Sequence, residues 1–206
     1  MSTKQSTNKI FMVEPREFYS NPQTQSSNHY QKKNENDEKQ LILDKALIEF
    51  HNFKSNLEKN GVEVLCLKGI EGCPDHIFPN WFITFENKTI QIFPMNAENR
   101  RREKTPEMIN KLCNTYKIQN NYSHLELENI FLESTSSMVF DRINRVVYAT
   151  PSPRTNEKFL NEWCERNKYD LCSFKTISHT GSDIYHTDVL MYVGTEIIGI
   201  SFDVID

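Results

Sequence analysis

The chain has 206 residues, and its 24 Lys and Arg residues stand against 28 Asp and Glu residues, which gives a formal charge of −4. This acidic balance argues against a free-standing nucleic-acid binder and against a polybasic membrane binder. Hydrophobic residues make up 37% of the chain and aromatic residues 11%, which excludes wholesale disorder and predicts one domain or two small ones. The mean hydropathy of −0.63 indicates that a long polar stretch is also present.

Neither a membrane segment nor a signal peptide is predicted. No run approaches the roughly 20 apolar residues that span a bilayer, and residues 1–9 are polar, so a cytoplasmic protein is expected. The cysteines are odd in number and form no C-x-x-C pair, which argues against a zinc site and against a disulfide framework. We therefore expect no metal, no cofactor, and reduced thiols at Cys66, Cys73, Cys113, Cys164 and Cys172.

The first predicted elements are a strand, a polar loop, a helix and a second strand. Ile10–Val13 is an apolar run typical of a short strand, whereas residues 20–40 are rich in Asn, Gln, Ser and Lys and predict a surface loop. Apolar residues then recur at steps of three and four over residues 41–57, which predicts a helix that Gly61 ends. The alternation in Val62–Leu67 predicts the second strand.

From residue 81 onward, a hairpin followed by a helix recurs. In chain order we predict a hairpin at 81–85 and 89–93, a helix at 98–116, a hairpin at 138–140 and 146–149, a helix at 155–167, a strand at 171–174, and a hairpin at 189–193 and 197–201. Successive hairpins start about fifty residues apart, which indicates repeated α+β units. Each unit is expected to bury one face of its sheet against neighbouring units. Because a chain that stops on a hairpin leaves an uncovered edge, we expect this chain to be C-terminally truncated.

Two segments carry carboxylates at the ends of predicted strands. Residues 74–81 place Asp75 on a loop after a proline and before aromatic residues, although an Asp that only caps a turn is an equal alternative. In residues 131–136, Glu133 closes an apolar strand and is followed by small hydroxyl residues. Both positions suit side chains that are collected in one cleft.

Two further segments could assist such carboxylates. His186 and Asp188 are two apart at the start of a predicted strand and are expected to point the same way, so the histidine could do acid–base work or could simply be packed in the core. Arg154 stands at a predicted helix start, where it could hold a carboxylate by a two-pronged contact or be an ordinary surface arginine.

These segments belong to a series of short motifs in a fixed order. The motifs are Met12-Val13 with Pro15 and Phe18, Asn21-Pro22-Gln23-Thr24, Pro74-Asp75 with Phe78-Pro79-Asn80-Trp81, Pro94-Met95 with Asn99-Arg100-Arg101, Leu132-Glu133, Asp141-Arg142, Ser152 with Arg154-Thr155, and His186-Thr187. In these motifs the chain resembles the amidinotransferase or guanidino-group-modifying superfamily, the penteins, and most closely its citrulline-hydrolase-like branch.

The resemblance implies a fold and a mechanism. The fold is an α/β propeller of ββαβ modules around a central site, of which this chain would supply about three of five as one incomplete domain, residues 1–206, with 20–40 as its polar surface loop. In the mechanism, a cysteine thiolate attacks the guanidino or ureido carbon of an arginine-like substrate, while a histidine protonates the leaving amine and then activates water.

The resemblance also implies roles for single residues. His186 would be the acid and base, Glu133 would orient it or pair with the guanidinium, Asp75 and Asn80 would hold the substrate nitrogens, Asp188 would be a second acid, and Arg154 would bind the substrate carboxylate. The four residues Asp75, Glu133, Arg154 and His186 are therefore expected to converge on one central pocket.

The chain departs from the family pattern at the nucleophile. In the family this cysteine follows a glycine-rich segment near the C-terminus, and no such position occurs before Asp206. Cys73 is a weak substitute, because a thiolate two residues from Asp75 would face a carboxylate that raises its pKa. Serines also replace glycines at Ser134 and Ser136, and a single Asn80 precedes the tryptophan where relatives show two asparagines.

The sequence is compatible with two alternative functions. The first is a guanidino-group-modifying hydrolase of citrulline hydrolase or arginine deiminase type, inactive as this fragment, with a small guanidino or ureido amino acid as its ligand. The second is a degenerate, non-catalytic pentein that binds a small amino acid, or a protein partner or itself through the open edge. A nucleic-acid partner is not expected, because the run at 100–102 reads as a solvated helix face balanced by Glu98 and Glu103.

Overall fold

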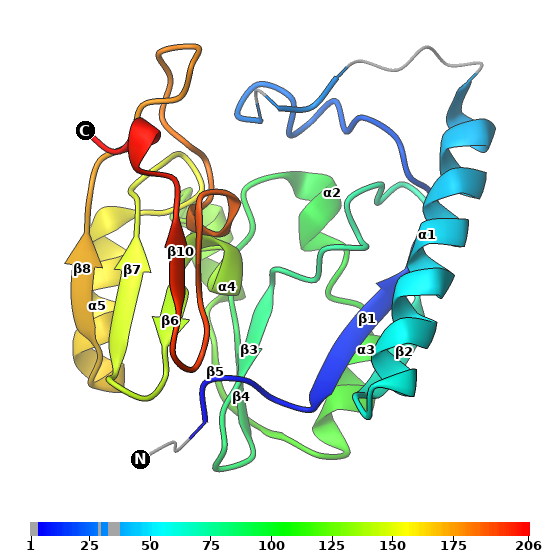
Figure 1. Cartoon of the computed structure of the whole chain (residues 1–206), viewed down its shortest axis with the longest axis horizontal. Coiled ribbons are helices and arrows are strands. Elements are labelled where there is room, and N and C mark those ends of the chain that lie inside the picture. Colours follow the sequence, from blue (N-terminus) through cyan, green and yellow to red (C-terminus); the bar gives the residue numbers. More distant parts are fainter. Residues whose placement is uncertain (1–3, 29, 33–37) are drawn as a thin grey trace. The chain divides into compact units, whose positions relative to one another are not determined.

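The computed structural model describes residues 4–28, 30–32 and 38–206 (Figure 1). Contacts between Cα atoms divide these residues into two compact units. The N-terminal unit consists of residues 7–79 and 97–110, and the C-terminal unit consists of residues 4–6, 80–96 and 111–206. That the whole chain forms one incomplete domain stays a prediction.

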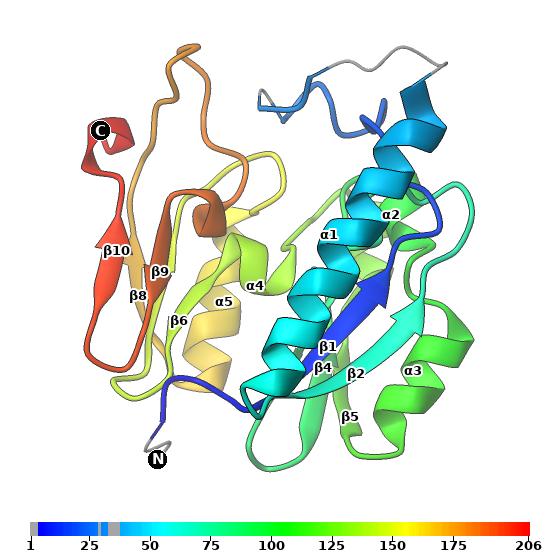
Figure 2. The same cartoon turned by 45° about the vertical axis from the view of Figure 1, so that its right-hand side comes forward.

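The N-terminal unit is built on one parallel strand pair. Strands β1 (Lys9–Glu14) and β2 (Glu63–Lys68) pair in register from Lys9 opposite Glu63 to Glu14 opposite Lys68. A parallel pair needs a long crossover, which is helix α1 (Lys39–Lys59), and Figure 2 shows this helix lying along the two strands. The helix ends as predicted, because Gly61 adopts a left-handed conformation with φ of +81°.

The C-terminal unit contains two three-stranded sheets of the same design. Strands β3 (Phe82–Thr84) and β4 (Thr89–Ile92) form an antiparallel hairpin, and β5 (Lys117–Asn121) joins β4 in parallel. Strands β6 (Val139–Asp141) and β7 (Val146–Ala149) form the second hairpin, and β8 (Asp170–Ser173) joins β7 in parallel after helix α5 (Glu157–Asn167). The predicted repeat is therefore confirmed as two ββαβ sheets, which a third hairpin of β9 (Met191–Val193) and β10 (Ile198–Ile200) follows.

One aromatic core holds these sheets to helix α5. Trp163 is fully buried, and its ring lies 5.9 Å from that of Phe93, 5.8 Å from that of Phe140 and 5.8 Å from that of Tyr169 between centroids. Its indole nitrogen donates a hydrogen bond of 2.7 Å to the side chain of Gln91. Because both sheets contribute to this core, the loops at their ends are held in fixed positions.

Four sequence predictions need correction. The helix expected at 98–116 is two helices, α2 (Glu98–Arg101) and α3 (Pro106–Cys113), because Pro106 cannot continue a helix and restricts the residue before it. Strand β5 was not predicted, since its sequence KIQNN has a single large apolar residue. Leu132 is not in a strand but forms an isolated bridge to Thr155, and the third hairpin starts late because Thr187–Val189 is a short 3-10 helix.

No helix within residues 4–28, 30–32 and 38–206 has the length and apolar character needed to cross a membrane.

Candidate active site

A buried carboxylate forms the centre of the candidate site in the C-terminal unit. Glu133 is 0% exposed and lies just before the short helix α4 (Ser134–Ser137). Its Oε1 atom accepts a hydrogen bond of 3.0 Å from the backbone N–H of Asn96, and its Oε2 atom lies 2.7 Å from Nε2 of His186. A buried carboxylate needs such partners, so its position and charge are fixed by its neighbours.

Helix α4 holds the glutamate through hydroxyl groups. Ser134 has a left-handed backbone with φ of +45°, and its Oγ donates a hydrogen bond of 2.7 Å to the carbonyl of Phe82. The Oγ of Ser137 accepts a bond of 2.9 Å from the backbone N–H of Glu133 and donates one of 3.1 Å to the carbonyl of Arg154. Serine therefore occupies the strained turn and compensates part of the strain with a hydrogen bond.

His186 comes from the segment that precedes β9. It is 4% exposed, and the next residue, Thr187, ties this segment to α4 by donating a hydrogen bond of 2.7 Å to the carbonyl of Ser137. Because an ionised carboxylate only accepts hydrogen bonds, the contact with Glu133 places the imidazole proton on Nε2. The Nδ1 atom makes no hydrogen bond to any residue that the structure describes, and its lone pair can therefore exchange a proton with a ligand.

Arg154 completes a charged cluster with Glu133 and His186. It is 3% exposed, which excludes the surface alternative, and its Nη1 lies 3.7 Å from Oε2 of Glu133. Its guanidinium also lies 4.6 Å from the ring centroid of Tyr185, a favourable cation–π contact. Arg154 lies in the turn before α5 and not at the helix start, because Asn156 is the N-cap and accepts a bond of 2.9 Å from the N–H of Phe159.

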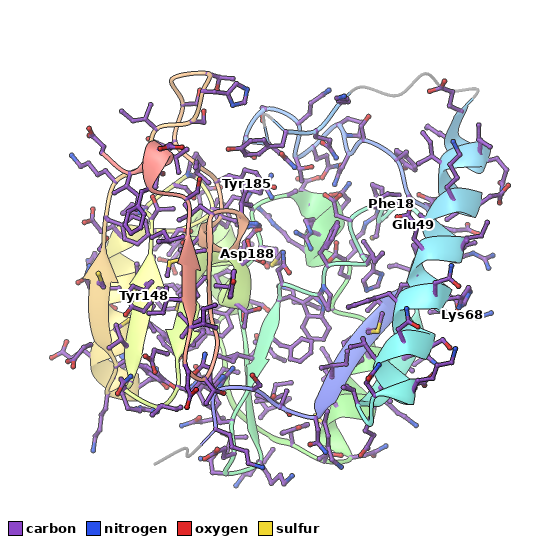
Figure 3. All side chains as sticks on the ribbon, viewed as in Figure 1. Phe18, Glu49, Lys68, Tyr148, Tyr185 and Asp188 are labelled. Carbon is purple, nitrogen blue, oxygen red and sulfur yellow. The ribbon has the colours of Figure 1, made fainter. Side chains whose placement is uncertain are left out.

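Asp188 lies in a 3-10 helix and not in the strand expected at this place. The strand alternation from which a shared direction of His186 and Asp188 was predicted is therefore absent here. Asp188 is exposed and accepts a hydrogen bond of 2.7 Å from Oγ of Ser136, whereas His186 is buried against Glu133. Figure 3 labels Asp188 on this segment together with Tyr185.

The predicted binding residue of the N-terminal unit is Asp75, which is half-buried. Its Oδ2 atom accepts hydrogen bonds of 2.7 Å from Nδ2 of Asn21 and 3.2 Å from Oγ1 of Thr24. The Oδ1 atom accepts no hydrogen bond from the described part of the chain. Asp75 is thus oriented by one oxygen while the other remains available to a ligand.

Asn21 was not assigned a role from the sequence. It is fully buried, its Oδ1 accepts a bond of 2.8 Å from Nδ2 of Asn99, and its Nδ2 contacts both Asp75 and Asn99. The prediction of a surface loop at 20–40 is therefore wrong at Asn21 and Thr24, while residues 29 and 33–37 lie outside the described residues. The Asn-Pro-x-Thr motif was the available signal, but its fully buried position could not be read from polar composition.

Arg100 secures the backbone around Asp75. It is 2% exposed, and its Nε and Nη2 atoms contact Glu103, which is 0% exposed, at 3.0 and 3.2 Å. Its Nη2 also donates hydrogen bonds to the carbonyls of Phe78 and Asp75. The prediction of a solvated arginine face is thus wrong for Arg100, although Arg102 is exposed.

Asn80 and the cysteines complete the predicted set. Asn80 is half-buried just before Trp81. Cys73 is 1% exposed and donates a hydrogen bond of 2.9 Å to the carbonyl of Asn99, and burial, followed by the nearby Glu103, raises the pKa of its thiol to about 11. The interfering carboxylate is Glu103 and not Asp75 as predicted. Such a thiol is a poor nucleophile at neutral pH.

No group of three His, Cys, Asp or Glu side chains that could hold a metal ion occurs in the described part of the chain. The site therefore offers a carboxylate, an imidazole and a guanidinium as its chemical groups.

The repeated ββαβ sheets and the buried carboxylate–imidazole pair are those of an α+β protein of pentein type. The sequence pattern of the family described as N,N dimethylarginine dimethylhydrolase, eukaryotic, matches residues 14–206, and the chain belongs to this family. The superfamily predicted from the sequence motifs is confirmed. No curated protein sequence matches the chain significantly.

Solved structures show the same fold at low sequence identity. The N-terminal domain of ArgZ bound to substrate, from an arginine dihydrolase of Cyanobacteria, is 15% identical with a TM-score of 0.70, covering 96% of this chain and 68% of that chain. AgrE bound to L-arginine is 16% identical with a TM-score of 0.67, covering 96% of this chain and 28% of that one. A dimethylarginine dimethylaminohydrolase adduct with S-methyl-L-thiocitrulline is 18% identical with a TM-score of 0.53, covering 80% and 59%. The chain thus spans only part of the length of these relatives.

Proposed function

We propose that this chain provides the acid–base and binding groups of a hydrolase that cleaves a C–N bond in the guanidino or ureido group of an arginine-like amino acid. The observation that carries the proposal is the buried pair of Glu133 and His186, whose atoms Oε2 and Nε2 are 2.7 Å apart. The family, together with the arginine dihydrolase and the L-arginine complex among the solved relatives, supports the same substrate class.

In this proposal His186 exchanges protons through Nδ1. Glu133 holds the imidazole in the tautomer with a proton on Nε2 and stabilises the imidazolium after Nδ1 has taken up a proton. From that state, Nδ1 can protonate a leaving amine and can then accept a proton from water. Arg154, 3.7 Å from Glu133, favours the ionised carboxylate on which this role depends.

Asp75 is proposed to bind a guanidino nitrogen through its available Oδ1 atom. A carboxylate that is held by one oxygen loses little side-chain freedom when the other oxygen binds a cation, which favours ligand binding. The amide of Asn80, the carboxylate of Asp188 and the guanidinium of Arg154 stay as predicted ligands of the substrate nitrogens and carboxylate.

The alternative is a pentein that binds an amino acid without turning it over. The observation that favours it is the state of the thiols, because burial raises the pKa of Cys73 and of Cys164 to about 11 and also raises the pKa of Cys66. None of these three thiols is therefore assigned as the nucleophile, and no role is assigned to the exposed Cys113 in α3 and Cys172 in β8.

Calorimetric binding and product analysis separate the two functions. The chain is titrated with L-arginine, L-citrulline and dimethyl-L-arginine, and the release of ammonia or dimethylamine is followed. We expect binding of at least one ligand, weakened about ten-fold or more by Glu133→Gln and by Asp75→Asn, and not by the exposed control His51→Gln.

If the chain releases product and His186→Gln abolishes that release, the hydrolase is established. If a ligand binds and no product is released, the alternative is established. The absence of binding for all three ligands, in a chain that unfolds cooperatively, would overturn both.

A further inference from the structure

The C-terminal unit has a cavity whose lining includes no residue of the candidate active site. Its volume is about 480 Å³, and it lies where the β3–β4 turn, the β6–β7 turn and the C-terminal end of α5 come together. Figure 1 shows both turns at the same end of the two sheets. Neither Glu133 nor His186 is among its lining residues, so its ligand is independent of the proposed function.

The lining of this cavity is strongly basic. It contains the four cations Arg142, Arg145, Arg166 and Lys168 and the single carboxylate Glu86, a balance of 4 − 1 = +3. Such a charge excess inside a concave surface attracts anions. The chain as a whole has a formal charge of −4, so the charge of the cavity lining is opposite in sign to that of the chain.

Two of these cations are already engaged by the protein. Arg145 donates hydrogen bonds to the carbonyls of Asn167 and Lys168 at the end of α5, and it lies 3.8 Å from the ring centroid of Tyr169. Arg166 pairs with Glu162 at 3.3 Å on the surface of the helix. The guanidinium of Arg145 thus covers the helix-end carbonyls, which would otherwise repel an anion.

Within the described part of the chain, the other two cations form no ion pair with a carboxylate. The hydrogen bond that Arg142 makes is a long one, 3.5 Å from Nη1 to the carbonyl of Thr84, and Lys168 forms no ion pair within the described part of the chain. Burial lowers the pKa of the Arg142 guanidinium, although Tyr169 and Glu86 act in the opposite direction. The guanidinium of Arg142 also lies 5.3 Å from the ring centroid of Phe140, and the bond to Thr84 uses one of its five donors.

The backbone gives a second, independent observation. Arg145 and Lys168 have left-handed backbones, with φ of +61° and +57°. Position 145 closes the β6–β7 turn and position 168 ends α5, and glycine is the least strained residue at both kinds of position. Two basic side chains therefore stand at strained positions and line one cavity.

We propose that this cavity binds a phosphate group, either as the inorganic ion or as part of a small phosphate ester. The planar fork of Arg142 suits two phosphate oxygens, and Lys168 adds a point charge. The rings of Phe85 and Tyr169 form the walls for the rest of an ester. The volume exceeds that of a bare phosphate ion and leaves room for a ligand of nucleotide size.

The most informative variant is Lys168→Gly. Glycine relieves the left-handed strain at the end of α5, so the melting temperature should rise, while the loss of a cation should weaken phosphate binding at least several-fold. Arg142→Gln should weaken binding about ten-fold or more, and Arg16→Gln, an exposed arginine of the N-terminal unit paired with Glu71, should change nothing.

Binding is measured by calorimetry at low salt with inorganic phosphate and with adenosine 5′-monophosphate, and again at high salt, where it should weaken. Tighter binding of the nucleotide assigns the site to a phosphate ester, and equal binding assigns it to the inorganic ion. The proposal is overturned if neither probe binds at millimolar concentration, or if Lys168→Gly is stabilised and binds both probes as the unmodified chain does.

Discussion

Ser134 shows how one residue can keep a site in shape at an energetic cost. Its left-handed φ of +45° is unfavourable for any residue with a side chain, but its hydroxyl is bonded to the carbonyl of Phe82 at 2.7 Å. The sequence shows that a serine follows Glu133. It does not show the compensating hydrogen bond, because Phe82 is 52 residues away.

Substitutions at Ser134 should separate strain from hydrogen bonding. Ser134→Ala keeps the strain and loses the bond, so it should lower the free energy of unfolding by about 1–2 kcal/mol. Ser134→Gly loses the bond but relieves the strain, and should stay within about 0.5 kcal/mol of the unmodified chain. Urea unfolding followed by tryptophan fluorescence measures the stability of both variants, because Trp81 and Trp163 lie in the same unit as Ser134.

The neighbouring exposed Thr135 is the matched control. It has no left-handed backbone, so the order should reverse there, with Thr135→Gly less stable than Thr135→Ala. Alanine and glycine of equal stability at position 134 would contradict the account of strain.

At the scale of elements, the loop at 20–28 supports Asp75 through its two buried residues, Asn21 and Thr24. Asn21 connects Asp75 with Asn99 through hydrogen bonds of 2.7 and 2.8 Å, and the backbone N–H of Asn99 donates a further bond of 2.8 Å to Gln23. This polar network takes the place of an apolar core at that point. It is stable only while every member has a partner.

Asn21→Ala should therefore destabilise the N-terminal unit. The change removes the partner of the Asn99 side-chain amide and the shorter of the two hydrogen bonds to Oδ2 of Asp75, so the free energy of unfolding should fall by about 2–3 kcal/mol. Urea unfolding is followed by far-ultraviolet circular dichroism, to which the 21-residue helix α1 of the same unit contributes. The control Asn52→Ala, on the exposed face of α1, should change stability by less than about 0.5 kcal/mol. An equal effect of both variants would show that Asn21 is not a structural link.

The sequence predicted elements well where periodicity was strong. The hairpin at β6 and β7 and the helix α5 have apolar spacing that specifies them locally, and both were found near their predicted positions. Strand β5 has the polar sequence KIQNN and becomes a strand only because β4 offers it a parallel partner. Tertiary pairing of this kind cannot be read from the segment itself.

At the scale of the whole molecule, the site depends on contacts that are distant in the chain. Glu133 meets Asn96 across 37 residues and His186 across 53 residues. Motif resemblance predicted Glu133 and His186 as site residues, but the contact between them and the buried position of Arg154 follow only from the folded geometry. The sequence could thus name candidate residues but not the bonds between them.

A buried histidine should make the stability of the chain depend on pH. His76 is 1% exposed, its Nδ1 accepts a bond of 3.2 Å from the N–H of Ile70, and its Nε2 has no partner at hydrogen-bonding distance in the described residues. Burial lowers the pKa of His76 to about 4 from its usual 6.5, with the nearby carbonyl of Glu103 acting in the opposite direction. Between these values the unfolded chain binds the proton and the folded chain does not.

Stability should therefore fall as the pH decreases from about 6.5 to about 4, by up to about 3 kcal/mol for this group, and should be fully present above pH 6.5. His76→Asn keeps an acceptor near Ile70 and removes the titration, so it should be less stable at pH 7 but lose less stability on acidification. Urea unfolding followed by the circular dichroism of α1 at several pH values measures the difference, with the exposed His51→Asn as control. Parallel pH curves for His76→Asn and the unmodified chain would show that the proton is taken up elsewhere, since removing the responsible group must flatten the acid branch.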